Sequence, residues 1–326
     1  MNRRETSSDC WPSDMKILLT GGTGLIGARL CKRFADAGHE LTVLSRRVSR
    51  VWERLGNTSV RHWRSLEEWA PDVQIDAIIN LAGESVVDHF WTDARKKALW
   101  NSRVGLTHFL VDRIRLAQRK PSVLLSGSAV GYYGFDDARV FKEADLSGKG
   151  FSALLCSEWE NAAREAQAWG VRVCLLRTGV VLSSQGGMLE KMCRPARRGV
   201  AVSLGSGRQW ISWIHEEDYG CMVQRFLEDD SCEGAYNMTA PCPVRERVFS
   251  GQLAELMGCR LRVRVPACAI RWGMGERSEL LLHGQQVVPG RWVTEGGGFL
   301  FPELPGALAN LLGDGPFDNH GNGMQR

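Results

Sequence analysis

The stretch that most constrains the fold is "MKILLTGGTGLIGARL", residues 15–30. Its first apolar run predicts a buried strand, and the apolar residues that follow at helical spacing predict a helix. Between them, Gly21, Gly24 and Gly27 permit a tight turn and a close approach of the backbone to a pyrophosphate at the helix N-terminus. This pattern predicts dinucleotide binding, against the alternative of a merely flexible turn. The residues expected to contact the dinucleotide are Gly21, Thr23, Gly24, Leu25, Ile26 and Gly27.

The alternation of apolar strands and helical segments continues along the chain. "IDAIINLAG", "PSVLLSGSA" and "VRVCLLRTGVVL" have the composition of strands buried on both faces. The pattern predicts an α/β fold with a doubly wound parallel sheet, the Rossmann fold, over residues 15–182. Gly, Pro and Ser-rich segments predict a smaller substrate-binding region over 183–312. The polar residues 1–14 and 313–326 are expected to be disordered, and either Met1 or Met15 could be the true start.

Composition excludes several classes of protein. The 326 residues include 41 Lys and Arg against 37 Asp and Glu, a net charge of +4 that indicates no nucleic acid and no membrane surface as a partner. Ten cysteines are scattered without a C-x-x-C pair, so we expect reduced thiols and no metal site. The N-terminus has no apolar signal segment. A cytoplasmic protein that acts on a small molecule is the prediction.

The end of the second predicted strand indicates which dinucleotide binds. An acidic residue at this place would hold the ribose 2'-hydroxyl of NAD, but the sequence has Ser45, Arg46 and Arg47. A guanidinium can grip a phosphate through two hydrogen bonds. We therefore predict NADP(H) as the cofactor, with a solvated basic strand end as the alternative.

Two further strand ends carry small or hydroxyl residues. "NLAGE" predicts cofactor contacts by Leu81, Ala82, Gly83 and Glu84, although a simple glycine turn would have the same sequence. "SGSAVGYYG" places serines at the end of the next strand, where one hydroxyl could hydrogen-bond a substrate carbonyl.

Six segments in order resemble the extended short-chain dehydrogenase/reductases. They are "TGGTGLIG", "NLAGE", "SGSAVGYYG", "LLRTGVVL", "WIHEED" and "YNMTAPCPV". The chain is most similar to the atypical epimerase family branch of that group, of the NAD-dependent epimerase/dehydratase type. "VPACAIRWGMGE" and the segment after it resemble the branch's short C-terminal domain.

The resemblance implies roles for residues at matching positions. The catalytic serine falls on Ser128, but the tyrosine and lysine of working members fall on Phe151 and Leu155. Neither side chain can move a proton. Tyr133 and Cys156 are the candidate replacements, each with a packed, inert side chain as the alternative.

The resemblance also implies further ligand contacts. Arg103 is expected to hold a phosphate or a substrate anion, with a solvated helical arginine as the alternative. Additional cofactor contacts are expected from Thr178, Gly179 and Val181. The substrate is expected to meet Arg208, Gln209, Trp210 and Trp213, which combine an anion-binding group with aromatic faces, unless the tryptophans only fill a domain contact. Extended members often form homodimers.

Two hypotheses for function follow. In the first, the chain is an NADP(H)-dependent oxidoreductase or epimerase-like enzyme in which Ser128 orients a carbonyl and water, Cys156 or a substrate group transfers the proton. In the second, it binds NADPH without catalysis, as a sensor or as a protein stabilised by the nucleotide. The replaced tyrosine and lysine favour the second hypothesis, and the retained serine and pocket favour the first.

Overall fold

The computed structural model describes residues 15–56 and 60–313. At its centre lies a sheet of seven strands that are all parallel. In spatial order the strands are β12 (Gly234–Met238), β7 (Arg172–Thr178), β5 (Val123–Ala129), β4 (Ala77–Asn80), β1 (Lys16–Thr20), β2 (Glu40–Leu44) and β3 (Val60–Trp63). The chain builds outwards from β1 in one direction and from β4 in the other. The predicted doubly wound sheet is confirmed.

Successive side chains of each central strand enter two different hydrophobic layers. In β1, Ile17 and Leu19 pack into one layer and Leu18 into the other. The same alternation occurs in β4, β5 and β7. Because both faces are buried, these strands are almost continuously apolar, which is why the sequence revealed them.

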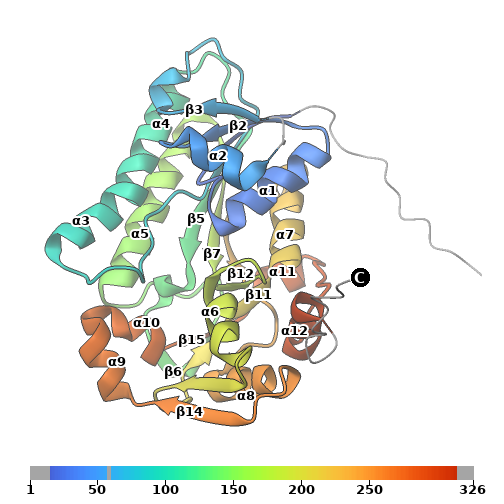
Figure 1. Ribbon diagram of the computed structural model, residues 1–326. Helices are drawn as coiled ribbons and strands as arrows, with labels where there is room; N and C mark the ends of the chain where they lie inside the picture. Colours follow the sequence, from blue (N-terminus) through green and yellow to red (C-terminus); the bar gives the residue numbers. More distant parts are fainter. Residues whose placement is uncertain (1–14, 57–59, 314–326) are drawn as a thin grey trace, which may run out of the picture.

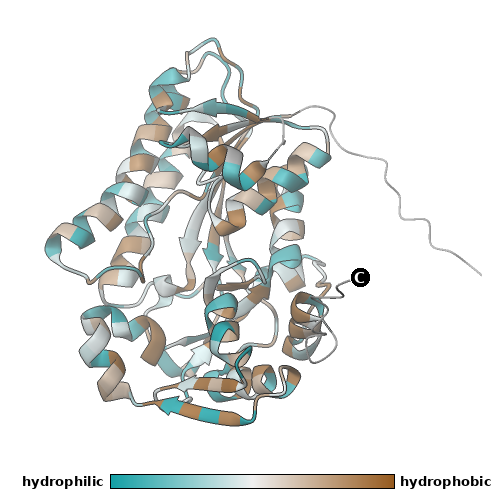
Figure 2. Ribbon diagram, viewed as in Figure 1, coloured by the Kyte–Doolittle hydropathy of each residue, from teal (hydrophilic) through white to brown (hydrophobic). Residues whose placement is uncertain are grey.

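Helices cover the two faces of the sheet, as Figure 1 shows. On one face lie α1 (Leu25–Asp36), α2 (Val48–Leu55) and α7 (Glu216–Glu228). On the other lie α4 (Leu106–Leu116) and α5 (Phe151–Arg164), with η1 (Leu66–Glu68) and η4 (Glu165–Trp169). α3 (Asp93–Trp100) leads into α4 through η2 (Asn101–Gly105), a π-helical turn. In Figure 2 the ribbons of these helices alternate between brown, for hydrophobic residues, and teal, for hydrophilic ones.

A C-terminal lobe lies beyond the carboxyl ends of the central strands, in the lower half of Figure 1. Its short strands form four pairs: β6 (Asp136–Phe141) with β15 (Gln285–Val287), β8 (Val180–Leu182) with β11 (Trp213–His215), β9 (Val200–Leu204) with β14 (Leu261–Val265), and β10 (Trp210–Ile211) with β13 (Val244–Arg245). The remaining elements are η3 (Val130–Tyr133), α6 (Gly187–Ala196), α8 (Glu246–Leu256), α9 (Ala267–Met274), η5 (Gly275–Ser278), α10 (Glu279–Leu282), α11 (Gly290–Thr294) and α12 (Leu304–Leu312). A separate apolar core holds α6, α8 and α12 together.

The central sheet does not end at residue 182, where the sequence placed the boundary between the two regions. Its last strand, β12, and the covering helix α7 come from the second half of the chain. The strand "GAYNM" is short and contains a buried Asn237, so it lacked the apolar run that marked the others. The disorder expected for residues 1–14 and for most of the tail lies outside the described residues.

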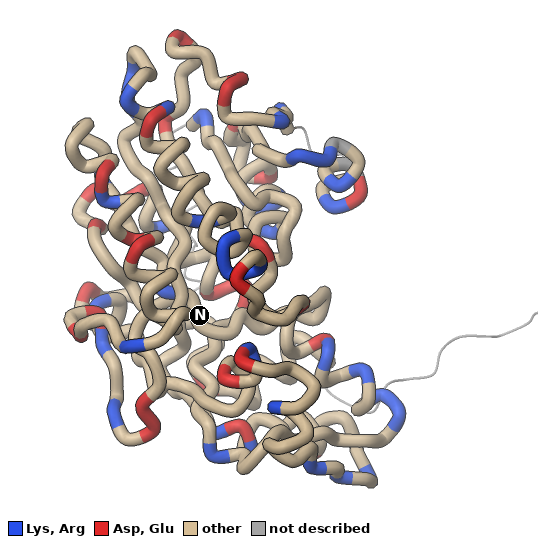
Figure 3. Tube along the Cα trace, turned by 90° about the vertical axis from the view of Figure 1, so that its left-hand side faces the viewer, with Lys and Arg blue, Asp and Glu red and all other residues tan. Residues whose placement is uncertain are grey.

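Several compositional expectations can be compared with the described ranges. Within residues 15–56 and 60–313, no helix is both long and apolar enough to cross a bilayer. The nine cysteines in these ranges are all free thiols. Figure 3 shows basic and acidic residues interspersed over both lobes.

A pair of helical glycines tests the packing of the first turn. A Cβ atom on Gly27 would lie 2.3 Å from the Gly21 carbonyl oxygen, whereas one on Gly251 in α8 would meet no atom within 4 Å. We expect Gly27→Ala to lower the free energy of unfolding by about 1–3 kcal/mol. Gly251→Ala should raise it by up to about 1 kcal/mol, because alanine favours helix. Urea unfolding measures both, and equal midpoints would contradict the steric argument.

Candidate active site

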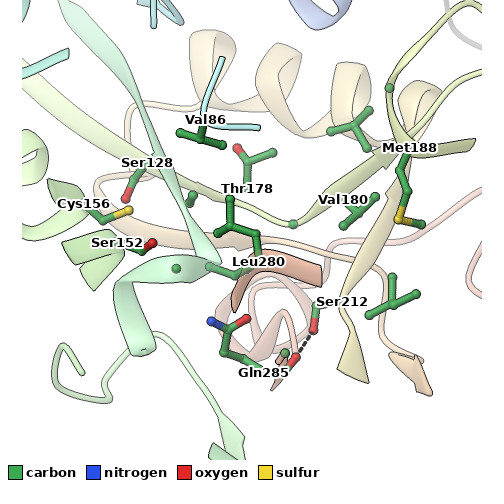
Figure 4. Close-up of a pocket in the computed structure, with 18 of the residues that line it drawn as sticks. Val86, Ser128, Ser152, Cys156, Thr178, Val180, Met188, Ser212, Leu280 and Gln285 are labelled. Carbon is green, nitrogen blue, oxygen red and sulfur yellow. Dashed lines mark hydrogen bonds between the residues drawn. The ribbon is translucent and has the colours of Figure 1, made fainter. Parts of the chain in front are cut away.

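A cavity of about 600 Å³ lies between the carboxyl ends of the central strands and the C-terminal lobe. Its walls come from the turn after β1, the ends of β4, β5 and β7, helix α5 and the lobe. Figure 4 shows Ser128, Ser152 and Cys156 on one side and Val180 and Met188 on the other. Open parallel sheets bind ligands at this edge, where the strand order reverses.

The glycine turn brings backbone, without side chains, to the cavity wall. Gly21 has a φ of +75°, and a Cβ atom there would lie 2.7 Å from the Leu81 carbonyl group. Gly24 caps α1 without a side-chain hydrogen bond, and the first turn of the helix contains no acidic residue. Amide groups at a helix N-terminus attract anions. The turn therefore fits the pyrophosphate of a dinucleotide.

Most of the predicted cofactor residues line this cavity. Those in its wall are Gly21, Gly24, Leu25, Ile26, Gly27, Leu81, Arg103, Thr178, Gly179 and Val181. Those outside it are Thr23, Ser45, Arg46, Arg47, Ala82, Gly83 and Glu84.

Arg46 does not line the cavity, and its side chain is 87% exposed. Its Nη2 is 3.2 Å from Glu84 Oε1, and Arg95 Nη1 is 3.1 Å from Glu84 Oε2. The hydrogen bonds from Arg95 and then Arg46 lower the pKa of the Glu84 carboxyl. An exposed ion pair of this kind contributes little stability, so Arg46 is available to another anion.

Arg103 projects from the π-helical turn η2 into the cavity wall. Its Nη2 donates to the Glu84 carbonyl oxygen at 2.9 Å, and its Cζ lies 5.4 Å from the centre of the Trp159 ring. Burial lowers the pKa of Arg103, yet a guanidinium keeps its charge in proteins. This placement favours ligand contact over a solvated helical arginine, since π-bulges often occur at functional sites.

Ser128 is held by a buried ion pair. Its hydroxyl donates to Glu160 Oε1 at 2.8 Å, and Arg177 donates to both oxygens of that carboxylate, at 2.8 and 2.9 Å. Glu160 is 0% and Arg177 2% exposed. Arg164 adds a hydrogen bond to Glu160 Oε2 at 3.0 Å. Because the serine proton points at Glu160, only the lone pairs of Oγ are directed elsewhere.

The two predicted proton carriers are poorly suited to act near neutral pH. The Tyr133 hydroxyl donates to Asn237 Oδ1 at 2.7 Å and accepts from Arg177 Nη1 at 2.9 Å, and its side chain does not line the cavity. Burial raises the pKa of Tyr133 to about 12 and that of Cys156, which does line the cavity, to about 11. Both groups stay protonated, and the structure favours the packed alternative for Tyr133.

An apolar cluster surrounds the positions of the missing tyrosine and lysine. The Phe151 ring meets Trp91 edge to face, with 5.2 Å between ring centres. Leu155 is buried beside Trp91 and Trp159. Both residues 151 and 155 line the cavity, so its wall offers hydrocarbon where an acid and a cation would stand in working short-chain reductases.

The four predicted substrate residues separate into two pairs. Gln209 and Trp210 line the cavity. Arg208 is exposed and lies outside it, and Trp213 is fully buried in the core of the lobe with its Nε1 donating to the Cys242 carbonyl. Arg208 therefore does not supply the expected anion-binding group in this cavity, and Trp213 does not supply an aromatic face.

Sequence reasoning missed the buried charges. Arg177 stands within the apolar strand "RVCLLRT", and a charge in a strand buried on both faces needs a partner. That signal was available, although it could not identify Glu160 as the partner. Glu246 lines the far side of the cavity, and no motif or pattern in the sequence indicated this position.

Two family models match the chain. Residues 17–238 match the NAD dependent epimerase/dehydratase family, and residues 265–311 match a domain of unknown function, DUF1731. The chain belongs to the NAD dependent epimerase/dehydratase family. This confirms the resemblance found in the sequence.

Relatives of this epimerase family chain include the chloroplastic epimerase family protein SDR39U1 homolog of Arabidopsis thaliana, which is 36% identical and aligns over 92% of this chain and 87% of the relative. Epimerase family protein YfhF of Bacillus subtilis is 33% identical, over 92% of this chain and 99% of its own. Human epimerase family protein SDR39U1, crystallised with NADPH, superimposes with a TM-score of 0.81 at 30% identity, covering 91% of this chain and 99% of the human one. DesIV of Streptomyces venezuelae, at 18% identity and a TM-score of 0.73, shares the fold.

The ion pair beneath Ser128 gives a stability prediction. Glu160→Gln leaves the Arg177 charge buried without a counter-charge, and we expect the free energy of unfolding to fall by about 3–5 kcal/mol. Glu165→Gln, in the exposed continuation of the same helix, should change it by less than about 0.5 kcal/mol. Urea unfolding of the two variants makes the comparison, and losses of similar size would show that the buried pair has no special role.

Proposed function

We propose that this chain is an NADP(H)-binding oxidoreductase or epimerase-like enzyme that acts on a small molecule. The observation that carries the proposal is the continuity of one cavity, which runs from the glycine turn past Ser128 into an apolar chamber of the C-terminal lobe. A nucleotide site alone would not need that chamber.

Selection of NADP(H) over NAD(H) rests on the end of β2. Ser45, Arg46 and Arg47 directly follow this strand in place of a carboxylate, and among the described residues Arg46 forms an exposed ion pair with Glu84. A 2'-phosphate would offer the guanidinium a doubly charged partner. The human relative, crystallised with NADPH, supports the same choice.

The bound nicotinamide would supply or accept a hydride. Ser128 would meet the substrate beside it as a hydrogen-bond acceptor, because its own proton is donated to Glu160. Such a serine orients a substrate hydroxyl better than a carbonyl. This modifies the role expected from the sequence, in which Ser128 donates to a carbonyl. Since Phe151, Leu155 and the protonated Cys156 form the adjacent wall, the proton would move through water or a substrate group.

The second candidate is a protein that binds NADPH without turnover. Three features favour it: the apolar cluster at residues 151 and 155, the raised pKa of Cys156 and the engagement of Ser128 by Glu160. The same cavity would then hold a regulatory ligand or none.

Transfer of a label separates the two candidates. The purified chain is incubated with NADPH that carries deuterium at the transferable position, together with a small-molecule extract of the source cells. We expect deuterium in a metabolite, detected by mass spectrometry, and at least about tenfold less with Ser128→Ala. Tight NADPH binding without deuterium transfer, together with no epimerised metabolite after incubation with NADP+ and the extract, would favour the non-catalytic candidate.

The charge of Arg46 gives a second test, which concerns the choice between NADPH and NADH. Arg46→Ala should weaken NADPH binding by about 10- to 100-fold and leave NADH binding nearly unchanged, because the lost charge-assisted hydrogen bonds are made only to the 2'-phosphate. Arg50→Ala, which replaces an exposed arginine in the first turn of α2, is the control and should change the binding of neither nucleotide. Calorimetric titration measures both nucleotides, and an equal loss for the two would contradict the assignment.

Three expectations from the sequence stay predictions: a cytoplasmic location, a homodimer, and the absence of nucleic acid and membrane partners.

A further inference from the structure

The chamber beyond Ser128 is mostly hydrocarbon. Its wall is formed by α6, β9, β10 and the segment from α10 to β15. Apolar side chains from these elements dominate it: Met188, Met192, Leu204, Ile211, Leu280 and Leu281. Figure 4 shows Leu280 at its centre, between Val180 and Cys156. Among the described residues that line the whole cavity, Arg103 is the only lysine or arginine.

Two buried side chains in the chamber wall carry acceptor oxygens without a hydrogen bond. They are Gln209 Oε1 and Glu246 Oε2. Gln209 is 4% and Glu246 3% exposed. A buried polar atom normally has a partner, and leaving one unpaired is costly. These two atoms therefore indicate a missing donor.

The orientation of each side chain is fixed by its other end. Gln209 Nε2 donates to the carbonyl oxygens of Leu204 and Leu281, at 2.9 and 3.0 Å, so the amide cannot turn its oxygen away. Glu246 Oε1 accepts from the Leu204 amide at 3.0 Å. The backbone of Leu204 thus anchors both side chains, Gln209 through its carbonyl oxygen and Glu246 through its amide group.

Glu246 has an environment that would suit a donor. Burial raises the pKa of its carboxyl, while the Leu204 amide, the charge of Arg264 and the Ser250 side chain act in the opposite direction. A group that donates to Oε2 would favour the ionised form, as hydrogen bonding to a carboxylate does in general.

We infer that the chamber binds a small molecule with an apolar body and a terminal hydrogen-bond donor, an ammonium or a hydroxyl group, which meets Gln209 Oε1 and Glu246 Oε2. The inference rests on the proposed function, because it takes this chamber to be the substrate end of the nucleotide cavity. It also disfavours a molecule that ends in a carboxylate or a phosphate here, since such a group would face the Gln209 acceptor and the ionised form of Glu246.

The test compares three probes of equal length: phenylbutylamine, phenylbutanol and phenylbutyrate. Each is titrated calorimetrically into the full chain in the presence of saturating NADPH. We expect the amine or the alcohol to bind at least about tenfold more tightly than the carboxylate. The amine or the alcohol would donate a hydrogen bond to the two oxygens, whereas the carboxylate would be repelled by them. The stronger of the two donors identifies the terminal group.

The substitution Glu246→Gln replaces an acceptor oxygen by a donor NH2 group and hardly changes the shape of the side chain. The Leu204 amide holds the oxygen of the new side chain, which places its NH2 group at the position of Oε2. Amine binding should fall by about tenfold and phenylbutyrate binding should rise. Glu255→Gln, an exposed position on the same helix α8, is the matched control and should leave the order of the three probes unchanged.

The outcomes distinguish this inference from the proposed function. If the unmodified chain does not bind NADPH, the proposed function is overturned. Normal NADPH binding with phenylbutyrate bound as tightly as the amine and the alcohol would overturn this inference alone, as would an unchanged probe order in Glu246→Gln. If that variant does not fold, the order of the three probes on the unmodified chain decides.

Discussion

The buried ion pair between Glu160 and Arg177 fixes the geometry on which the site depends. It joins α5 to β7 with two charges that are almost completely removed from water, a costly arrangement that is tolerable only because their remaining hydrogen-bonding atoms find partners. Ser128 and Arg164 satisfy the carboxylate, and the Tyr133 hydroxyl and the Glu143 carbonyl satisfy the guanidinium. Because Glu160 can occupy only this place, the register of α5 against the sheet is fixed as well. That register presents Phe151, Leu155 and Cys156 to the cavity.

The same pair decides what the serine can do. A hydroxyl beside an uncharged neighbour could turn its proton towards a ligand, but Ser128 would have to leave a carboxylate that already accepts its hydrogen bond. Its lone pairs are then the part available to a substrate. Sequence reasoning treated Tyr133 as a candidate acid and did not consider Arg177. In the structure the two side chains are hydrogen-bonded to each other and support this arrangement. The chemistry of the site is thus determined by groups that do not line the cavity.

Local patterns in the sequence predicted the half of the site that is built from consecutive residues. The strand, glycine turn and helix around Gly21 and Gly27 form one continuous segment, so spacing alone indicated their role. The Glu160–Arg177 pair could not be predicted, because its members come from a helix and a strand that meet only after folding. The prediction from "GSGRQWISWIH" was wrong in part for a related reason. Its two tryptophans belong to two very short strands, β10 and β11, and Trp210 lies in the cavity wall whereas Trp213 lies in the core. Residue type alone could not separate them.

The two ends of the cavity make opposite demands on a ligand. At the glycine turn, a helix N-terminus without acidic residues favours an anion. At the far wall, Gln209 Oε1 and Glu246 Oε2 require a donor, and hydrocarbon lies between the two ends. A substrate that carries its own diphosphate would need cations in the chamber, yet Arg103, the only arginine or lysine in the described lining, lies against Gly83 and the Glu84 carbonyl near the ends of the central strands. DesIV, a dTDP-glucose 4,6-dehydratase, shares the fold over 91% of this chain. Because a shared fold does not fix the ligand, the lining of the chamber is the better guide, and it fits the less charged molecule that we propose.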